Sequence, residues 1–305
     1  MNRRLLLVLI ALCTCISLTS GALAEGITPI GQPAPGGNGN IVEVTRYTWL
    51  GTNIVRHDIL IDTAIAGDPQ TAANYVTGPE PQASLNCQAT SDQPEVVAQF
   101  CLNSWSWPES AMPVRVKYNP VDPAGLDVPS AIGPIQNAIE QWSSVTPNFS
   151  YVFDGTTTAR PTACDTDASV DGINTIAWVD GIAGVKGILA QTCTVRTPEG
   201  ALQGFDMEIS SNIPWSIDTP TPPKTYDLYS NMLHEMGHGA GLAHSQYSSA
   251  VMYSSLNSAT EKRTLTPDDI AALEAKYGDS TQEGNPVVVG PHDAYKLNVP
   301  GIIHD

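Results

Sequence analysis

The stretch HEMGHGAGLAHS, residues 234–245, holds three of the six histidines of the chain together with one glutamate. His234 and His238 are four residues apart, so on a helix they project from the same face, one turn apart. Gly241 can adopt the positive φ that ends such a helix and turns the chain. His244 can then return toward the pair, and the sequence predicts that three imidazoles meet at one point.

This arrangement has a clear chemical meaning. Three neutral imidazoles with an open fourth position are typical of a catalytic zinc site, whereas structural zinc usually has four protein ligands. We therefore expect His234, His238 and His244 to bind one Zn²⁺ ion. Glu235 lies about 100° further around the helix, where it should border the open position. It is the expected general base, because bound zinc lowers the pKa of its water to about 7.

The full pattern is too specific for coincidence. At average composition, the five fixed residues of HExxHxxGxxH arise in a chain of this length with a probability on the order of one in a hundred thousand. HExxHxxGxxH followed by a methionine turn is the metzincin signature. Within that clan the chain resembles the matrixins, the family of the matrix metalloproteases, because Ser245 follows the third histidine and Met252 comes shortly after it. The resemblance extends over most of residues 112–278.

The resemblance implies a fold. It is an α+β, α/β-like metzincin fold with a twisted, mostly parallel five-stranded sheet and one antiparallel edge strand. An active-site helix and a C-terminal helix complete it. The edge strand is expected in ILAQTCTV, residues 188–195, where residues 189–191 could pair with an extended peptide.

The resemblance also assigns roles to residues. It gives zinc binding to the three histidines, acid/base work to Glu235 and a supporting floor beneath the zinc to Met252. Animal matrixins hold a second zinc through further histidines, but no histidine lies between His57 and His234, so we expect one zinc ion. Structural Ca²⁺ is compatible with the resemblance, although no site is selected. The latency cysteine motif of animal matrixins is absent, and Cys87 or Cys101 remains an alternative thiolate cap.

Local patterns predict the other elements. Alternation of apolar and polar residues predicts a hairpin over residues 41–62 and strands within 113–120, 148–155, 174–181, 188–195 and 202–210. Helical spacing predicts a helix within 129–147. Asp227 should cap the histidine helix, and Thr266 should begin a last helix that ends at Gly278. Residues 63–110 show no regular pattern and are expected to be irregular.

Four segments are expected along the chain. Residues 1–24 resemble a signal peptide, residues 111–278 form the metzincin-like catalytic domain and residues 279–305 a polar tail. Residues 25–110 are a propeptide, an accessory segment or a targeting element. The net charge of −17 argues against nucleic-acid binding. No later apolar run is long enough to span a membrane, so the protein is expected to be secreted, extracellular or periplasmic.

Cysteine content fits an oxidising compartment. Removal of the signal leaves four cysteines, which would most simply form two disulfides in one of three pairings. Closeness along the chain favours Cys87 with Cys101 and Cys164 with Cys193.

The predicted function is that of a secreted, zinc-dependent metalloendopeptidase that hydrolyses internal bonds of a protein or peptide substrate. Two alternatives stay open. One is a catalytically silent secreted binding protein on a metzincin scaffold, and the other is a zinc hydrolase of non-peptide substrates. Substrate preference and oligomeric state are left open.

Overall fold

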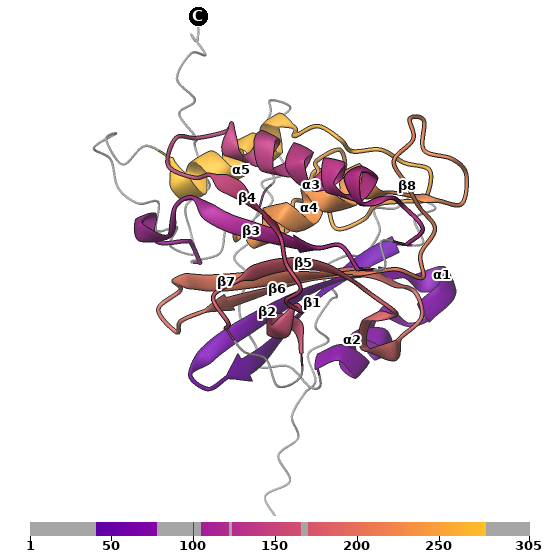
Figure 1. Ribbon diagram of the computed structural model, residues 1–305, viewed down its shortest axis with the longest axis horizontal. Helices are drawn as coiled ribbons and strands as arrows, with labels where there is room; N and C mark the ends of the chain where they lie inside the picture. Colours follow the sequence, from indigo (N-terminus) through magenta and orange to yellow (C-terminus); the bar gives the residue numbers. More distant parts are fainter. Residues whose placement is uncertain (1–40, 78–99, 101–104, 122–123, 166–169, 279–305) are drawn as a thin grey trace, which may run out of the picture.

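One twisted sheet forms the molecule, with the longer helices on one face and two short helices toward the other (Figure 1). The computed structural model describes residues 41–77, 100, 105–121, 124–165 and 170–278. The expected signal peptide, the tail and the Cys87–Cys101 pair therefore lie outside the described residues. The strands are β1 (Ile41–Leu50), β2 (Asn53–Asp62), β3 (Val114–Asn119), β4 (Tyr151–Thr156), β5 (Asn174–Val179), β6 (Ile188–Arg196) and β7 (Leu202–Ser210), with a separate short pair, β8 (Trp215–Ser216) and β9 (Tyr226–Asp227). The α-helices are α1 (Thr63–Ala66), α2 (Pro69–Thr77), α3 (Val128–Ser143), α4 (Leu228–Gly239) and α5 (Pro267–Tyr277).

The predicted five-stranded unit is confirmed. Its strand order is β6-β7-β5-β3-β4, and all neighbours pair in parallel except β6 with β7, which are antiparallel. Helices α3, α4 and α5 cover one face of this unit (Figure 1). The fold is the metzincin fold that the sequence predicts.

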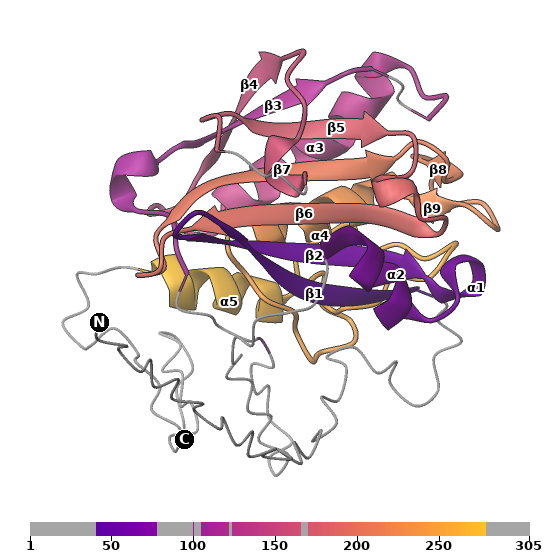
Figure 2. The same cartoon turned by 90° about the horizontal axis from the view of Figure 1, so that it is seen from below.

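A hairpin extends the sheet beyond this unit. Strands β1 and β2 pair antiparallel over their full lengths, and β2 pairs antiparallel with β6 from Ile54 opposite Arg196 to Ile61 opposite Ile188. Figure 2 shows the hairpin beside β6, on the side away from β7. The backbone of residues 189–191, which was expected to be open to a peptide, is paired with β2 instead.

The expectation that residues 63–110 are irregular is wrong for their first part. Helix α1 begins where Asp62 accepts a hydrogen bond from the backbone N–H of Ala64, at 2.8 Å, and α2 follows directly. Both helices are short, and their sequences contain few large apolar residues. Periodicity is therefore a weak signal for them.

The buried helix α4 is fixed at both ends. Asp227 caps its start by accepting from the backbone N–H of Ser230 at 2.9 Å, as predicted. Gly241 has a φ of 85° just after its end, which turns the chain as expected. Aromatic side chains donate hydrogen bonds to carbonyls within the helix and at its end, namely Trp142 to Leu233, Tyr151 to Met236, Trp107 to Gly239 and Tyr277 to Ala240.

The predicted disulfide between Cys164 and Cys193 is present. It joins the short helix Thr162–Cys164 to β6, the strand that pairs with β2 of the hairpin. In the described part of the chain, no helix is both long enough and apolar enough to cross a membrane.

Candidate metal centre

The three predicted histidines come together. His234 and His238 extend from α4, and His244 returns after the turn at Gly241. The Nε2 atoms of His234 and His238 are 3.1 Å apart. The ring of His244 lies 5.7 Å from that of His234 and 4.9 Å from that of His238, between centroids.

Backbone carbonyls fix which imidazole nitrogen faces the centre. His234 donates from Nδ1 to the carbonyl of Val251 at 2.6 Å, and His238 donates from Nδ1 to the carbonyl of Leu242 at 3.0 Å. A carbonyl only accepts, so each Nδ1 carries a proton. In the neutral form of the ring, which is the form that binds a metal, each Nε2 then turns a lone pair toward the other. Two lone pairs at 3.1 Å repel unless a cation lies between them. Nitrogen ligands on one tetrahedral zinc ion stand about 3.3 Å apart, so the geometry fits a metal.

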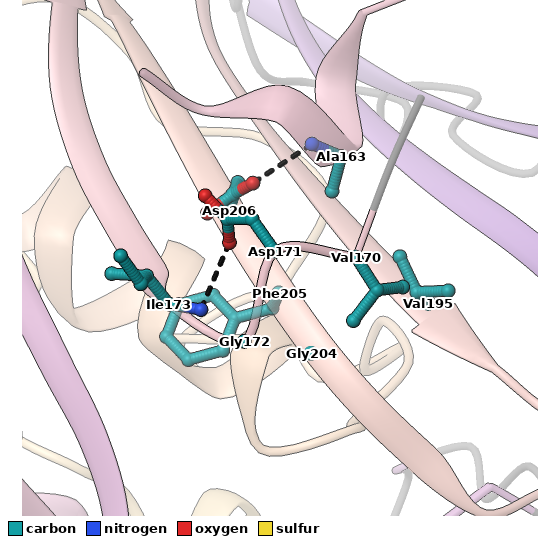
Figure 3. Close-up of a pocket in the computed structure, with 9 residues that line it drawn as sticks. All are labelled: Ala163, Val170, Asp171, Gly172, Ile173, Val195, Gly204, Phe205 and Asp206. Atoms are coloured by element: carbon teal, nitrogen blue, oxygen red, sulfur yellow. Dashed lines mark hydrogen bonds between the residues drawn. The ribbon is translucent and has the colours of Figure 1, made fainter. Parts of the chain in front are cut away.

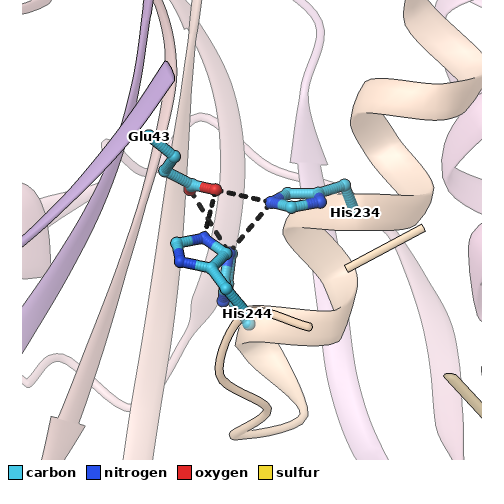
Figure 4. A group of neighbouring side chains, drawn as sticks. Glu43, His234 and His244 are labelled. Carbon is cyan, nitrogen blue, oxygen red and sulfur yellow. Dashed lines mark hydrogen bonds and ion pairs between the residues drawn. The ribbon is translucent and has the colours of Figure 1, made fainter. Parts of the chain in front are cut away.

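Glu43 on β1 is the fourth member of the cluster. The sequence prediction did not include it. Its Oε2 lies 2.6 Å from Nε2 of His234 and also contacts Nε2 of His244, while its Oε1 lies 3.2 Å from Nε2 of His238 (Figure 4). Together, one ligand atom from each of these four residues lies within 4.8 Å of the others, and the group could hold a metal ion.

Burial and charge act in opposite directions on Glu43. Its side chain is fully buried. Burial raises the pKa of its carboxyl, but the charges of His244, His234 and His238 outweigh burial and hold that pKa well below its usual value. The available signal was its place in β1, because strand alternation puts Glu43 on the same face as Ile41 and Tyr47, which are both buried in the core. An acidic residue on an inward face needs a cationic partner.

Glu235 stands beside the cluster and is fully buried. Its Oε2 accepts a hydrogen bond of 2.6 Å from the hydroxyl of Thr192 on β6. Its Oε1 has no hydrogen-bond partner among the described residues. Burial and the negative charge of Glu43 raise the pKa of Glu235 to about 7, so the carboxyl is poised to take up or release a proton near neutral pH.

The chain after His244 is held by the first turn of α5. The Asp269 carboxylate accepts from the backbone N–H groups of Val251 and Met252, at 2.9 and 3.0 Å. Asp268 accepts from the hydroxyl of Ser245 at 2.6 Å. Both aspartates lie in the first turn of the last helix predicted from the sequence, and no local pattern indicates this second task.

Met252 packs directly against α4, the helix that carries His234 and His238. A Cβ atom added at Gly237, between the two helical histidines, would lie 2.2 Å from the Met252 sulfur. The side chain of Met252 therefore fills the space beside Gly237 that a larger residue would occupy.

A further buried acid, on β7, lines a small cavity of about 10 Å³ (Figure 3). Asp206 accepts hydrogen bonds from the backbone N–H groups of Ala163 and Thr175, at 2.8 and 2.7 Å. Burial raises its pKa to about 7. Because its oxygens are used to hold two backbone segments, Asp206 has a structural explanation and is not part of the histidine cluster.

Comparison with known families decides the classification. The family model described as Matrixin matches residues 112–278, more than half of the chain. The chain belongs to the matrixin family. The match contains every strand of the five-stranded unit and the three histidines, whereas the hairpin of this matrixin precedes it.

Similar curated proteins agree with this assignment. Metalloendoproteinase 1-MMP of Arabidopsis thaliana is 35% identical over 147 residues, which cover 47% of this chain and 36% of that protein. Interstitial collagenase of Oryctolagus cuniculus is 28% identical over 203 residues, which cover 63% of this chain and 37% of that protein. The matrixin described here thus spans little more than a third of the length of either relative. Metalloproteinase-II from Bacteroides fragilis is a structural match with a TM-score of 0.32 and 11% identity, covering 78% of this chain and 77% of that one.

Proposed function

We propose that this matrixin is a secreted zinc metalloendopeptidase that cleaves internal peptide bonds, with its catalytic domain in residues 111–278. The observation that carries the proposal is the meeting of the three histidine Nε2 atoms beside the buried carboxylate of Glu235. His234, His238 and His244 would hold the zinc ion, which supplies a Lewis acid and a water of lowered pKa when bound.

Glu235 would do the proton transfer. One oxygen is held by Thr192 and the other has no partner among the described residues, so it can accept a proton from the attacking water. Glu235 would then deliver that proton to the nitrogen of the departing amine. Burial of the site strengthens these electrostatic interactions because it excludes bulk water.

Two observations support action outside the cytoplasm. Residues 1–24 have the pattern of an export signal. The Cys164–Cys193 disulfide is of a kind that persists in oxidising compartments and is rare in the cytosol.

Glu43 favours a second candidate function. Four protein ligands are typical of structural zinc, so a centre with Glu43 permanently in place would suit a binding protein that keeps the scaffold without catalysis. The enzyme needs Glu235 for cleavage, whereas the binding protein does not need it. The two candidates therefore predict opposite effects of replacing Glu235.

Replacement of the general base separates the candidates. The measurements are zinc content and cleavage of a peptide library at saturating zinc, on protein that is intact and on protein after limited proteolysis. For an enzyme, Glu235→Ala should retain one zinc per chain and lose peptide cleavage by about a factor of 10² to 10⁴. Glu109→Gln, an exposed control, should behave like the wild type. Equal cleavage by Glu235→Ala and the wild type, or none by either, would contradict the proposal.

A further inference from the structure

The β1–β2 hairpin lies where an extended substrate would have to bind. Strand β2 runs antiparallel to β6 and is paired with Gln191 and Ala190 through Ile59 and Leu60. A peptide that adds to a sheet edge needs free backbone N–H and C=O groups on that edge. Those of β6 face β7 on one side and β2 on the other, so no edge is left for a peptide in this state.

The same hairpin closes the metal centre. Strand β1 is paired with β2, with Glu43 opposite Leu60, and from there the Glu43 side chain reaches all three histidines. Figure 4 shows its carboxylate pointing toward His234 and His244. Among the described residues, every side chain that bonds to this buried carboxylate is one of the predicted zinc ligands. Glu43 thus takes the place that a catalytic centre keeps open for water.

Further bonds hold the hairpin on the other sides of the site. The backbone N–H of Glu43 donates to the carbonyl of Ser254 at 3.1 Å, and the hydroxyl of Ser255 donates to the carbonyl of Ile41 at 2.7 Å. Both serines lie just after Met252. Beneath the hairpin, the buried Arg56 guanidinium donates to the carbonyl of Leu242 at 3.1 Å. The hairpin is therefore fixed to β6, to the segment after Met252 and to the loop between the histidines.

We propose that residues 41–62 are an autoinhibitory plug in which β2 occupies the substrate edge of β6 and Glu43 is the fourth zinc ligand. The inference rests on the proposed function. It makes the enzyme latent through a carboxylate and a paired strand, without a cysteine thiolate.

Two observations favour a plug that can be displaced over a permanent part of the site. The hairpin precedes the matched matrixin region, and all five strands of the metzincin unit lie outside it. Glu235, moreover, is a fully buried acid with one oxygen unpartnered in the described residues. Burying such a group is costly, and a permanently closed metal site has no use for it.

Access to the metal tests the plug directly. The full-length protein is loaded with Co²⁺ in place of zinc, and its visible absorption spectrum is followed during titration with acetohydroxamate, which binds only at an open metal position. Glu43→Gln keeps the size of the side chain and removes its charge. We expect this variant to respond at an acetohydroxamate concentration at least tenfold lower than the wild type needs. Glu140→Gln, an exposed control on α3, should match the wild type. Equal responses of wild type and Glu43→Gln would overturn the proposal.

A second measurement needs no variant and covers the case in which Glu43→Gln does not fold. Wild-type protein is treated with immobilised trypsin, which is then removed, and each resulting species is assayed on the peptide library and identified by intact mass. Cleavage should rise at least tenfold only in species that have lost residues 41–62. Full cleavage by species that retain them would refute the plug. If Glu43→Gln gains acetohydroxamate binding but no species cleaves peptides, the proposed function fails while the plug stands.

Discussion

At the residue scale, the contact between Thr192 and Glu235 connects the sheet to the proposed chemistry. Thr192 lies on β6 and its hydroxyl donates to Oε2 of Glu235 at 2.6 Å. Both side chains are fully buried, so no solvent competes for the bond. The hydroxyl therefore holds the carboxylate in one orientation, with its second oxygen turned away from Thr192.

Thr192→Val tests this positioning role. Valine has the same shape but no donor, and loss of one hydrogen bond to a charged group costs about 1.5 kcal/mol or more. We expect kcat for peptide cleavage by the active form to fall about tenfold, while KM and zinc content stay unchanged.

Thr194→Val is the matched control for that experiment. Thr194 is also buried on β6, and no described hydrogen bond links it to Glu235. If both valine variants lose the same activity, or if Thr192→Val loses zinc, the hydroxyl does not act through Glu235.

The sequence predicted part of this residue-scale arrangement. His234, Glu235 and His238 share one helix, and His244 follows after the chain turns at Gly241. Their spacing along the sequence is therefore enough to predict how they meet. Glu43 reaches His234 across 191 residues. That meeting depends on which edge of the sheet the hairpin joins, and no local pattern specifies the edge.

At the element scale, predictions succeeded where the signal is contained within the element. Helix α5 begins at Thr266 with a capping box in which Thr266 and Asp269 satisfy each other's backbone N–H groups. The turn between β1 and β2 lies at residues 51 and 52, as the alternation of the two strands indicated. Helices α1 and α2 were missed because packing on the hairpin, rather than their own sequence, stabilises them.

Strand β2 carries a histidine whose ionisation should make the protein sensitive to acid. His57 is buried between the Thr48 hydroxyl, 2.8 Å from Nε2, and the Cys193 sulfur, 3.3 Å from Nδ1. Burial lowers its pKa to about 4, although Asp58 acts in the opposite direction. The unfolded chain binds a proton near pH 6.5, so between pH 6.5 and 4 the unfolded state holds more protons than the native state, and stability falls as the pH falls.

His57→Gln removes this titration. From pH 6.5 to 4, the free energy of unfolding of the wild type should decrease by roughly 3 kcal/mol more than that of the variant. Urea denaturation at several pH values measures both slopes, and the histidines of the metal centre are common to both proteins. Parallel slopes would show that folding leaves the pKa of His57 at its unfolded value.

At the scale of the whole molecule, the five-stranded unit was predictable because each of its strands carries a clear alternation and the matrixin resemblance supplied their order. The seven-stranded sheet was not. Its extra pairing of β2 with β6 joins residues 54–61 to residues 188–196, and the same hairpin sequence would suit any free edge. The family resemblance could not supply this pairing either, because the hairpin precedes the region that carries the resemblance.

The Cys164–Cys193 disulfide links the short helix Thr162–Cys164 to β6 at this side of the sheet. It closes a loop with a sequence separation of 29 residues, and it packs in a small core with Val55 of the hairpin and Val195 of β6. Closing a loop of this length reduces the entropy of the unfolded chain and contributes roughly 3 to 4 kcal/mol in the chain-entropy model.

Replacing both cysteines, Cys164→Ala with Cys193→Ala, should lower the free energy of unfolding by about that amount, because the native contacts change little while the unfolded chain gains freedom. Urea denaturation of wild type and variant measures the difference. A reducing agent should weaken the wild type toward the variant and leave the variant unchanged, which separates the bridge from the loss of two small side chains. If the reducing agent has no effect on the wild type, while the variant is destabilised, the stabilisation comes from packing of the sulfur atoms and not from the covalent link.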